Sequence, residues 1–224
     1  GHVYVVDADL QGYFDTIPKD RLMQLIEVKI SDRRLLGLIR GFLDQPILEE
    51  LQEWTPEAGV PQGAVLSPLL SNLYLNELDH RMAELGYEMV RYADDFVILC
   101  RSQEQAEAAL EEVKRFVREA GLTLHPDKTH IVDSREKSFD FLGYSFRGKL
   151  RFPRAKSHRK LVDTIRRLTP RKSGQSLEAT IAEINRTTRG WFTYFRHCTW
   201  NIFGDYDGMI RRRLRDQLRK RHRR

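Results

Sequence analysis

The sequence has few cysteines and no long apolar run. Its 224 residues include two cysteines, Cys100 and Cys198, which form neither a metal-binding pattern nor a disulfide framework. We therefore expect both to be free thiols in a reducing compartment. The sequence also lacks a signal peptide and any apolar stretch near the roughly 18 residues that a membrane-spanning helix needs. We expect a soluble, cytoplasmic protein with no membrane partner.

Acidic residues are scarce in the last third of the chain. Residues 151–224 hold 21 lysines and arginines against six acidic residues, a net charge of +15, whereas residues 1–150 carry a net charge of −9. This division favours a metal-dependent core joined to a module that binds a polyanion. A basic tail that only aids solubility is the alternative, although helical apolar periodicity within the basic segment argues against it.

Two adjacent carboxylates, Asp94 and Asp95, stand between two apolar runs of strand length. The second run, residues 96–100, is nearly continuous, as in a strand buried on both faces. The polar break between the runs is short, so we predict a β-hairpin with its turn at the acidic pair. Asp is a common turn residue, which is the simpler explanation of the pair. The apolar flanks and a third carboxylate upstream favour a functional role instead.

The third carboxylate ends the first predicted strand, residues 3–9. Strand alternation places Asp7 and Asp9 on one face. A strand that ends in Asp9 beside a hairpin tipped by Asp94 and Asp95 brings three carboxylates together. Hard oxygen donors of this kind suit Mg²⁺, and such a cluster can hold two ions about 4 Å apart. The cluster is therefore a candidate site for phosphoryl transfer.

Hydrophobic periodicity predicts an α+β fold for the first two thirds of the chain. Helices are predicted over 18–30, 32–43, 68–85 and 102–120, with Ser102 as the N-cap of the last one. Extended segments are predicted over 47–58 as a hairpin or loop, over 122–124 as a strand, and over 139–146 as a strand pair. Asp15 is predicted to lie in a turn or to cap a helix. The apolar face of the third helix is expected to contain Leu69, Leu70, Leu73, Met82 and Leu85.

From about residue 154 the pattern is purely helical and basic. We predict three amphipathic helices that pack as a small bundle and expose arginines to phosphate. Ser176 is the predicted cap of the second of them. The aromatic residues of that helix, such as Trp191 and Phe195, are interpreted as core, with base-stacking platforms as the alternative.

Five motifs follow one another along the chain. They are Asp9 with Phe14 five residues later, Gly59-Val60-Pro61-Gln62-Gly63 before residues 67–72, Tyr92-Ala93-Asp94-Asp95, Leu122-Thr123-Leu124 before Lys128-Thr129, and Phe141-Leu142-Gly143-Tyr144. Together they resemble the palm of a reverse transcriptase, and their order and spacing are most similar to the enzymes encoded by bacterial group II introns. A further stretch, Asn185-Arg186 with residues 189–195, resembles the thumb, or maturase-specific, region of group II intron proteins.

The resemblance implies an α+β reverse-transcriptase palm over residues 1–153, with an antiparallel sheet and packed helices, followed by an all-α three-helix thumb over 154–224. It implies an RNA-directed DNA polymerase that copies intron RNA by two-metal nucleotidyl transfer and assists splicing by binding that RNA. Its cofactor would be two Mg²⁺ ions, with Mn²⁺ as a substitute. The implied catalytic residues are Asp9, Asp94 and Asp95. The same three carboxylates, together with the backbone carbonyl of Leu10, are the implied metal ligands.

The resemblance also assigns residues to the substrates. The nucleotide-binding residues are Phe14, Pro61, Gln62, Gly63 and Lys128. Phe14 would lie beneath the sugar and exclude a 2′-hydroxyl, although a core aromatic explains it equally well, and an ordinary surface lysine explains Lys128 equally well. The primer- and template-binding residues are Tyr92, Gly143, Arg186 and Arg189.

The implied partners are intron RNA, an RNA–DNA template–primer and dNTPs, in the bacterial cytoplasm. In the family, the fingers precede the first palm strand. The chain does not begin with Met and its first strand starts almost at residue 1, so we expect a fingers segment elsewhere on the same or another chain. A non-catalytic module that binds intron RNA, or an inactive fragment, is the alternative function.

Overall fold

The computed structural model describes residues 1–49, 52–54, 56–61, 63–171, 174–199 and 202–222. The chain divides into two compact units, Gly1–Asp133 and Ser134–Arg224, and each is described by itself. Within the described ranges, no helix is both long enough and apolar enough to span a bilayer.

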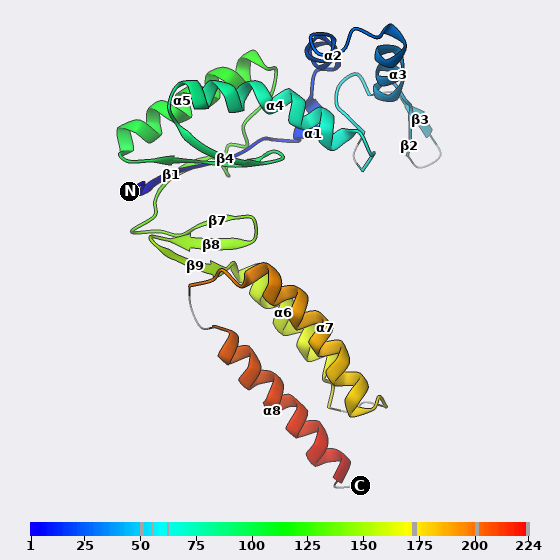
Figure 1. Ribbon diagram of the computed structural model, residues 1–224, viewed down its shortest axis with the longest axis vertical. Helices are drawn as coiled ribbons and strands as arrows, with labels where there is room; N and C mark the ends of the chain where they lie inside the picture. The colour runs from blue at the N-terminus through cyan, green and yellow to red at the C-terminus, as the bar shows by residue number, and fades with distance from the viewer. Residues whose placement is uncertain (50–51, 55, 62, 172–173, 200–201, 223–224) are drawn as a thin grey trace. The chain divides into compact units, whose positions relative to one another are not determined.

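The first unit is built on a four-stranded antiparallel sheet (Figure 1). Its strands, in spatial order, are β4 (Glu88–Tyr92), β5 (Asp95–Cys100), β1 (Tyr4–Asp9) and β6 (His130–Asp133). The strand β1 lies between β5 and β6, with Val6 opposite Ile98 on one side and opposite Ile131 on the other. The strands β4 and β5 form the predicted hairpin around the acidic pair, so that prediction is confirmed.

Two helices, α4 (Ser67–Glu84) and α5 (Gln103–Glu119), lie on the same side of this sheet (Figure 1). Strand residues such as Val6, Ala8 and Ile98 are completely buried in the core that includes both helices. The predicted cap of α5 is confirmed, because the Ser102 hydroxyl accepts a hydrogen bond from the Gln105 backbone N–H at 3.2 Å. Burial of the apolar strand faces is the main stabilising contribution to this layer.

Smaller elements complete the first unit. They are α1 (Tyr13–Thr16), α2 (Lys19–Glu27), α3 (Arg33–Leu43), β2 (Ile47–Glu49) and β3 (Gln52–Trp54). The paired strands β2 and β3 confirm the hairpin predicted for this region. Asp32 caps α3 by accepting hydrogen bonds from the Arg34 and Leu35 N–H groups. Asp15 lies inside α1, whose N-cap is Gly12, so the predicted capping role for Asp15 is wrong.

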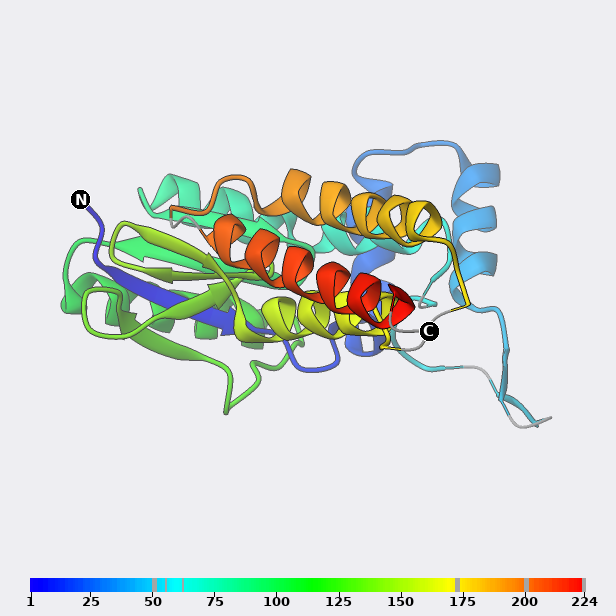
Figure 2. The ribbon, with the colours of Figure 1, turned by 90° about the horizontal axis from the view of Figure 1, so that it is seen from below.

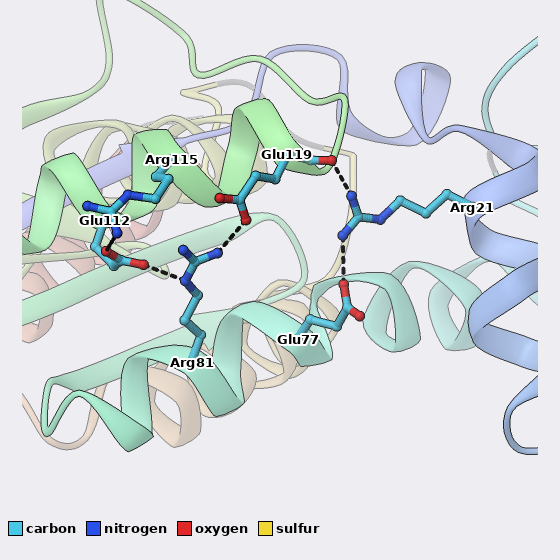
Figure 3. Close-up of polar contacts among 6 residues, drawn as sticks. All are labelled: Arg21, Glu77, Arg81, Glu112, Arg115 and Glu119. Carbon is cyan, nitrogen blue, oxygen red and sulfur yellow. Dashed lines mark hydrogen bonds and ion pairs between the residues drawn. The ribbon is translucent and has the colours of Figure 1, made fainter.

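Ion pairs join α2, α4 and α5 on the surface of the first unit (Figure 3). Arg81 on α4 binds both Glu112 and Glu119 of α5, and Arg21 on α2 binds Glu77 of α4 at 2.8 Å. The exposed members of this network, Arg21–Glu77 and Arg81–Glu119, contribute about 0–1 kcal/mol each, whereas Glu112 is largely buried beneath Arg81. The network therefore orients the helices more than it stabilises the core.

Two predictions for the first unit are wrong in detail. Leu69 and Leu85 do not join the buried face of α4, because they are 66% and 54% exposed, and Tyr74, Leu75 and Leu78 are buried instead. Residues 122–124 do not form a strand and make only one isolated bridge, between Leu124 and Leu10. The strand that completes the sheet is β6, since only that segment continues along the edge of β1.

The second unit contains a three-stranded antiparallel sheet and three helices. They are β7 (Phe139–Phe141), β8 (Tyr144–Arg147), β9 (Leu150–Pro153), α6 (Ala155–Leu168), α7 (Leu177–Phe195) and α8 (Ile202–His222). The helices lie side by side (Figure 2), around a core that includes Leu161, Ile165 and Tyr206. The predicted strand pair, the three basic helices and the Ser176 cap are confirmed. The third strand, β9, was not predicted from the sequence.

Hydrogen bonds join this small sheet to its own helices. The Gly143 carbonyl accepts from the Arg154 N–H at 2.9 Å and from the Ser157 hydroxyl at 3.2 Å. The Tyr194 hydroxyl donates to the Leu142 carbonyl at 2.7 Å. Packing therefore places residues 134–153 with the helices, whereas the sequence prediction placed them with residues 1–133. The functional boundary at residues 153 and 154 stays a prediction.

Candidate active site

The carboxylates of Asp9 and Asp95 lie on neighbouring strands at the same level of the sheet. Asp9 ends β1, Asp95 begins β5, and the two are direct partners in the antiparallel register. Directly opposed residues project to the same face, with Cβ atoms roughly 4.5–5.5 Å apart. The register thus confirms that Asp9 and Asp95 are direct neighbours, while their role as metal ligands stays a prediction.

The third carboxylate is in the hairpin loop that joins β4 to β5. The loop consists of Ala93 and Asp94, and Ala93 has a φ of +57°. This left-handed conformation is unfavourable for a residue with a Cβ, and two-residue hairpin loops usually fill it with Gly, Asn or Asp. Asp94 and Asp95 are both partly buried. The acidic pair is thus held on a tight and strained connection.

Lys128 supplies a cation to this carboxylate group. Its ammonium nitrogen donates to Oδ2 of Asp9 at 2.8 Å. This hydrogen bond is the main cause that raises the pKa of Lys128, and the charges of Asp94 and Asp95 add to the rise. The loop that carries Lys128 is tied to β1, because the His125 N–H donates to the Asp9 carbonyl at 2.8 Å. All three predicted catalytic carboxylates therefore act electrostatically on one ammonium group.

The carboxylates fit Mg²⁺ by donor chemistry rather than by preformed geometry. In the parts of the chain that the structure describes, no three acidic, histidine or cysteine side chains are close enough to hold one ion together. Yet a cation already lies on Asp9, and hard oxygen donors are the usual Mg²⁺ ligands. The isolated bridge between Leu10 and Leu124 consists of two hydrogen bonds, one from the Gln11 N–H to the Thr123 carbonyl and one from the His125 N–H to the Asp9 carbonyl. The Leu10 carbonyl takes part in neither of them.

Phe14 and the turn after Gly59 lie against each other. The Phe14 carbonyl accepts from the Val60 N–H at 2.7 Å, and the Gly59 N–H donates to the Ile17 carbonyl at 2.8 Å. A Cβ on Gly59 would stand 2.8 Å from the Phe14 carbonyl oxygen, so a larger residue cannot fit there without movement. This glycine therefore permits a close approach between the backbone of the turn and the backbone at Phe14 and Asp15, rather than an approach to a ligand.

The other predicted nucleotide-binding residues differ in their surroundings. The Pro61 carbonyl accepts from the Ser67 hydroxyl at the start of α4, and Gly63 is exposed. Gln62 lies outside the described residues. Phe14 is partly buried and meets the Tyr13 ring edge-on at 5.5 Å between centroids. The Tyr13 hydroxyl donates to the Ser71 carbonyl at 2.6 Å, which anchors α1 to α4.

Sequence reasoning missed Arg91, which lies in β4 two residues before Ala93. Its guanidinium binds both carboxylate oxygens of Asp79, donates to Oδ1 of Asn72 at 2.9 Å, and donates to the Ala93 carbonyl at 2.8 Å. The hydrogen bond to Asp79 is the main cause that raises the pKa of Arg91. The sequence did offer one signal for this residue, because an arginine stands in the strand that leads directly into the acidic pair.

The predicted primer- and template-binding residues fall on both units. Tyr92 is 67% exposed on β4, and Arg186 and Arg189 are exposed on α7. Gly143 has a φ of +79° and lies near Tyr194 and Phe195. An aromatic hollow of about 390 Å³ opens in the second unit beside this glycine. Its lining consists of Phe141, Leu142, Tyr144, Phe146, Arg151, Tyr194 and His197.

The aromatic residues of α7 divide between core and surface. Phe195 is buried and Trp191 packs against the core of the three helices, as predicted. Phe192 and Tyr194, in contrast, are about half exposed. The interpretation as core therefore applies to Trp191 and Phe195, whereas Phe192 and Tyr194 are exposed enough to stack on a base.

An antiparallel sheet backed by two helices, with paired aspartates at the junction of a central strand and an acidic hairpin, is the architecture of a polymerase palm. Residues 1–146 match the family model described as reverse transcriptase (RNA-dependent DNA polymerase). Residues 158–224 match the model described as group II intron, maturase-specific domain. The first model matches well over half of the chain. The chain therefore belongs to the reverse transcriptase family.

Named relatives agree with this assignment. The chain is 29% identical over 222 residues to protein YkfC of Escherichia coli (strain K12), a match covering 81% of this chain and 56% of YkfC. It is 29% identical over 212 residues to the group II intron-encoded protein LtrA of Lactococcus lactis subsp. cremoris, covering 66% of this chain but 35% of LtrA. The chain thus spans about a third to a half of the length of these two relatives.

A solved structure agrees on the fold. The foamy viral protease-reverse transcriptase, determined in complex with an RNA/DNA hybrid, matches with a TM-score of 0.53 at 20% identity, over 87% of this chain and 21% of that chain. The predicted fold class, a reverse-transcriptase palm with antiparallel sheet and packed helices followed by a helical region, is confirmed.

Proposed function

We propose that the chain is the palm and thumb of a group II intron reverse transcriptase, which copies intron RNA into DNA and binds that RNA to assist splicing. The observation that supports the catalytic part best is the register of Asp9 opposite Asp95, with Asp94 in the adjoining loop. Two strands and one tight turn thereby bring three carboxylates to one end of the sheet.

In this proposal Asp9, Asp94 and Asp95 hold two Mg²⁺ ions, with the Leu10 carbonyl as a further ligand. Bound there, the ions would activate a primer 3′-hydroxyl and stabilise the leaving oxygen. Lys128 can exchange Asp9 for the triphosphate of a dNTP, because its side chain is 60% exposed and its ion pair with Asp9 is open to solvent. Phe14 is proposed to lie beneath the sugar, and Pro61 and Gly63 to line the nucleotide; Gln62, outside the described residues, is assigned to the same side by resemblance alone.

The basic helices of the second unit are proposed to bind nucleic acid. The support is the +15 charge of residues 151–224, the exposed Arg186 and Arg189, and the match to the maturase-specific domain. Exposed arginines and lysines bind a phosphate backbone by neutralising its charge and releasing its counterions. The aromatic hollow beside Gly143 offers flat apolar walls next to Arg151, which suits a strand of template–primer.

A non-catalytic module that binds intron RNA is the second candidate. It is favoured by the ion pair between Lys128 and Asp9 and by the lack of a preformed metal cluster within the described part of the chain. RNA binding by the helices needs neither feature. The two candidates therefore differ only in metal-dependent chemistry.

Primer extension with Mg²⁺ separates the candidates. We expect Asp94→Asn and Asp95→Asn each to lower nucleotide addition by at least about 10²-fold, as loss of a preorganised electrostatic group does. Both variants should keep the wild-type melting temperature. Asp20→Asn is the matched control, since that carboxylate is 84% exposed and pairs with Arg40 of α3 rather than with a residue of the acidic turn. Near wild-type extension by either active-site variant would refute the catalytic proposal.

A further inference from the structure

Arg91 connects the acidic turn to the helix behind it. Its side chain is only 11% exposed, and three of its four described hydrogen bonds go to Asn72 and Asp79 on α4. These two acceptors are seven residues apart, so they lie on the same face of the helix, two turns from each other. The guanidinium is therefore fixed in place from one side by a rigid element.

The fourth hydrogen bond of Arg91 goes to the backbone carbonyl of Ala93, at 2.8 Å. Ala93 is the residue with the left-handed φ of +57°, a conformation that costs an alanine about 1–2 kcal/mol. A charged donor to a backbone carbonyl is among the stronger protein hydrogen bonds. The donor thus acts on the peptide that joins Ala93 to Asp94, directly before the two carboxylates.

We propose that Arg91 is a positioning residue, which holds the Ala93 peptide in its strained conformation and thereby places the carboxylates of Asp94 and Asp95 for metal binding. Asp79 and Asn72 act through Arg91 by fixing its guanidinium plane. The role in metal binding rests on the proposed function, whereas the role in shaping the loop does not.

A purely structural ion pair would behave differently. Arg81 offers the matched case, because it also lies on the first unit and binds two carboxylates, Glu112 and Glu119, on a neighbouring helix rather than on the loop (Figure 3). Arg91→Gln removes four hydrogen bonds of a charged donor and Arg81→Gln removes two, so both variants should lower the melting temperature. Only Arg91→Gln should alter the loop.

The first measurement is the backbone chemical shifts of residues 92–95 by nuclear magnetic resonance. We expect Arg91→Gln to shift the Ala93 resonances away from left-handed values, whereas Arg81→Gln leaves them unchanged. Ala93→Gly, which removes the steric cost of the positive φ, should restore the shifts of Asp94 and Asp95 in the Arg91→Gln background. Unchanged Ala93 shifts in a folded Arg91→Gln variant would overturn the proposal.

The second measurement is Mn²⁺ affinity by calorimetry, with Asp94→Asn as the reference for loss of the site. We expect Arg91→Gln to weaken Mn²⁺ binding by about tenfold, equivalent to about 1.4 kcal/mol, and Ala93→Gly to recover most of that loss. If Arg91→Gln does not fold, Asn72→Ala should give the same changes in smaller degree. Equal affinity of wild type and Arg91→Gln would overturn the metal-positioning role.

The two measurements separate this inference from the proposed function. Equal Mn²⁺ affinity of wild type and Asp94→Asn would refute the metal site. The chemical shifts of Ala93 would still show whether Arg91 holds the loop. A chain that binds Mn²⁺ through Asp94 with no effect of Arg91 on either measurement would refute the inference alone.

Discussion

Single side chains determine the electrostatics of the carboxylate group. In the ion pair of Asp9 with Lys128, the Asp9 side chain is the more enclosed partner, 26% exposed against 60% for the lysine. The ion pair gives the cluster a counter-charge from within the chain. In the proposed function, the same ammonium would compete with a metal for Asp9 and would be available to a triphosphate once a metal had bound.

We expect Lys128→Met to strengthen Mn²⁺ binding several-fold, because it removes the competing cation from Asp9. The same variant should weaken dNTP binding, which appears as a raised KM in primer extension. Lys114→Met, which removes a lysine that pairs with Glu111 on the same helix, α5, is the control and should change neither quantity. Unaltered Mn²⁺ affinity of Lys128→Met would show that the ion pair does not compete with metal.

Phe14 has two explanations that one substitution can separate. In a form of the protein that extends primers, we expect Phe14→Ala to incorporate ribonucleotides more readily, because the ring would no longer meet a 2′-hydroxyl. Phe42→Ala removes another aromatic that is partly buried against the same core, and it should lose stability without altering sugar selectivity. Unchanged selectivity of Phe14→Ala would make Phe14 a core residue alone.

At the scale of elements, α4 is the support of the site. Its Ser71 carbonyl holds Tyr13, and its Asn72 and Asp79 side chains hold Arg91. The turn after Gly59 leads into α4 and is bonded to α1 at Phe14. Residues proposed to bind the nucleotide and residues proposed to bind metal are therefore both connected to one helix.

The glycines of the turn give a matched pair of predictions. Gly63 has a φ of +80° with no atom within 4 Å of the position that a Cβ would take, so Gly63→Ala should cost about 1 kcal/mol for the conformation alone. Gly59 has a φ of +94° and backbone atoms within 3 Å of that position, so Gly59→Ala should cost more, about 3 kcal/mol or above. Urea unfolding measures both, and equal losses would contradict the close approach of Gly59 to Phe14.

Alkaline pH should loosen the contact between α4 and α5. Burial raises the pKa of Tyr74 to about 12, and its hydroxyl donates to the Ala120 carbonyl. The unfolded tyrosine ionises near pH 10, about two units lower, so unfolding releases a proton at high pH. The stabilisation is complete below pH 10 and is lost as the pH rises to 12, in total about 3 kcal/mol.

The measurement is the free energy of unfolding between pH 9 and 12. Tyr74→Phe should start less stable, because the hydrogen bond is lost, and then fall less steeply with pH than wild type. Tyr92→Phe is the control for loss of a tyrosine hydroxyl, since the Tyr92 side chain is 67% exposed. Parallel pH profiles of wild type and Tyr74→Phe would contradict this source of alkaline sensitivity.

At the scale of the whole molecule, charge is divided along the chain. The net charge of +15 in residues 151–224 resides on helices whose apolar stripes are used in their own core. The arginines are thereby left on the surface, as with Arg186 and Arg189. Binding of RNA should consequently be dominated by release of counterions and depend steeply on salt.

We expect a slope near −4 for the logarithm of RNA affinity against the logarithm of salt, if about five phosphates are contacted. Arg186→Gln and Arg189→Gln should each reduce its magnitude by about 0.7–0.9. Arg33→Gln and Arg34→Gln on α3 are exposed controls from the first unit and should leave it unchanged, as should Asp94→Asn. Equal effects of the α3 and α7 variants would refute a specific role of the second unit.

Local sequence signals determined most of the secondary structure. The acidic hairpin, the Ser102 and Ser176 caps and the basic amphipathic helices follow from turn chemistry, capping and periodicity, which act over a few residues. The strand prediction over 122–124 failed because β-propensity depends on which neighbour is available, and β6 took the place beside β1.

Only the tertiary structure decided how the site is assembled. The pairing of Asp9 with Asp95 could be expected from two strand ends, but its register depends on packing of the whole sheet. The hydrogen bonds from Arg91 to α4 and the ion pair of Lys128 with Asp9 join residues that are far apart in the sequence, and no local sequence pattern predicts which of these residues meet. The sequence alone therefore determined which chemical groups this protein carries, whereas long-range packing decided which of them meet.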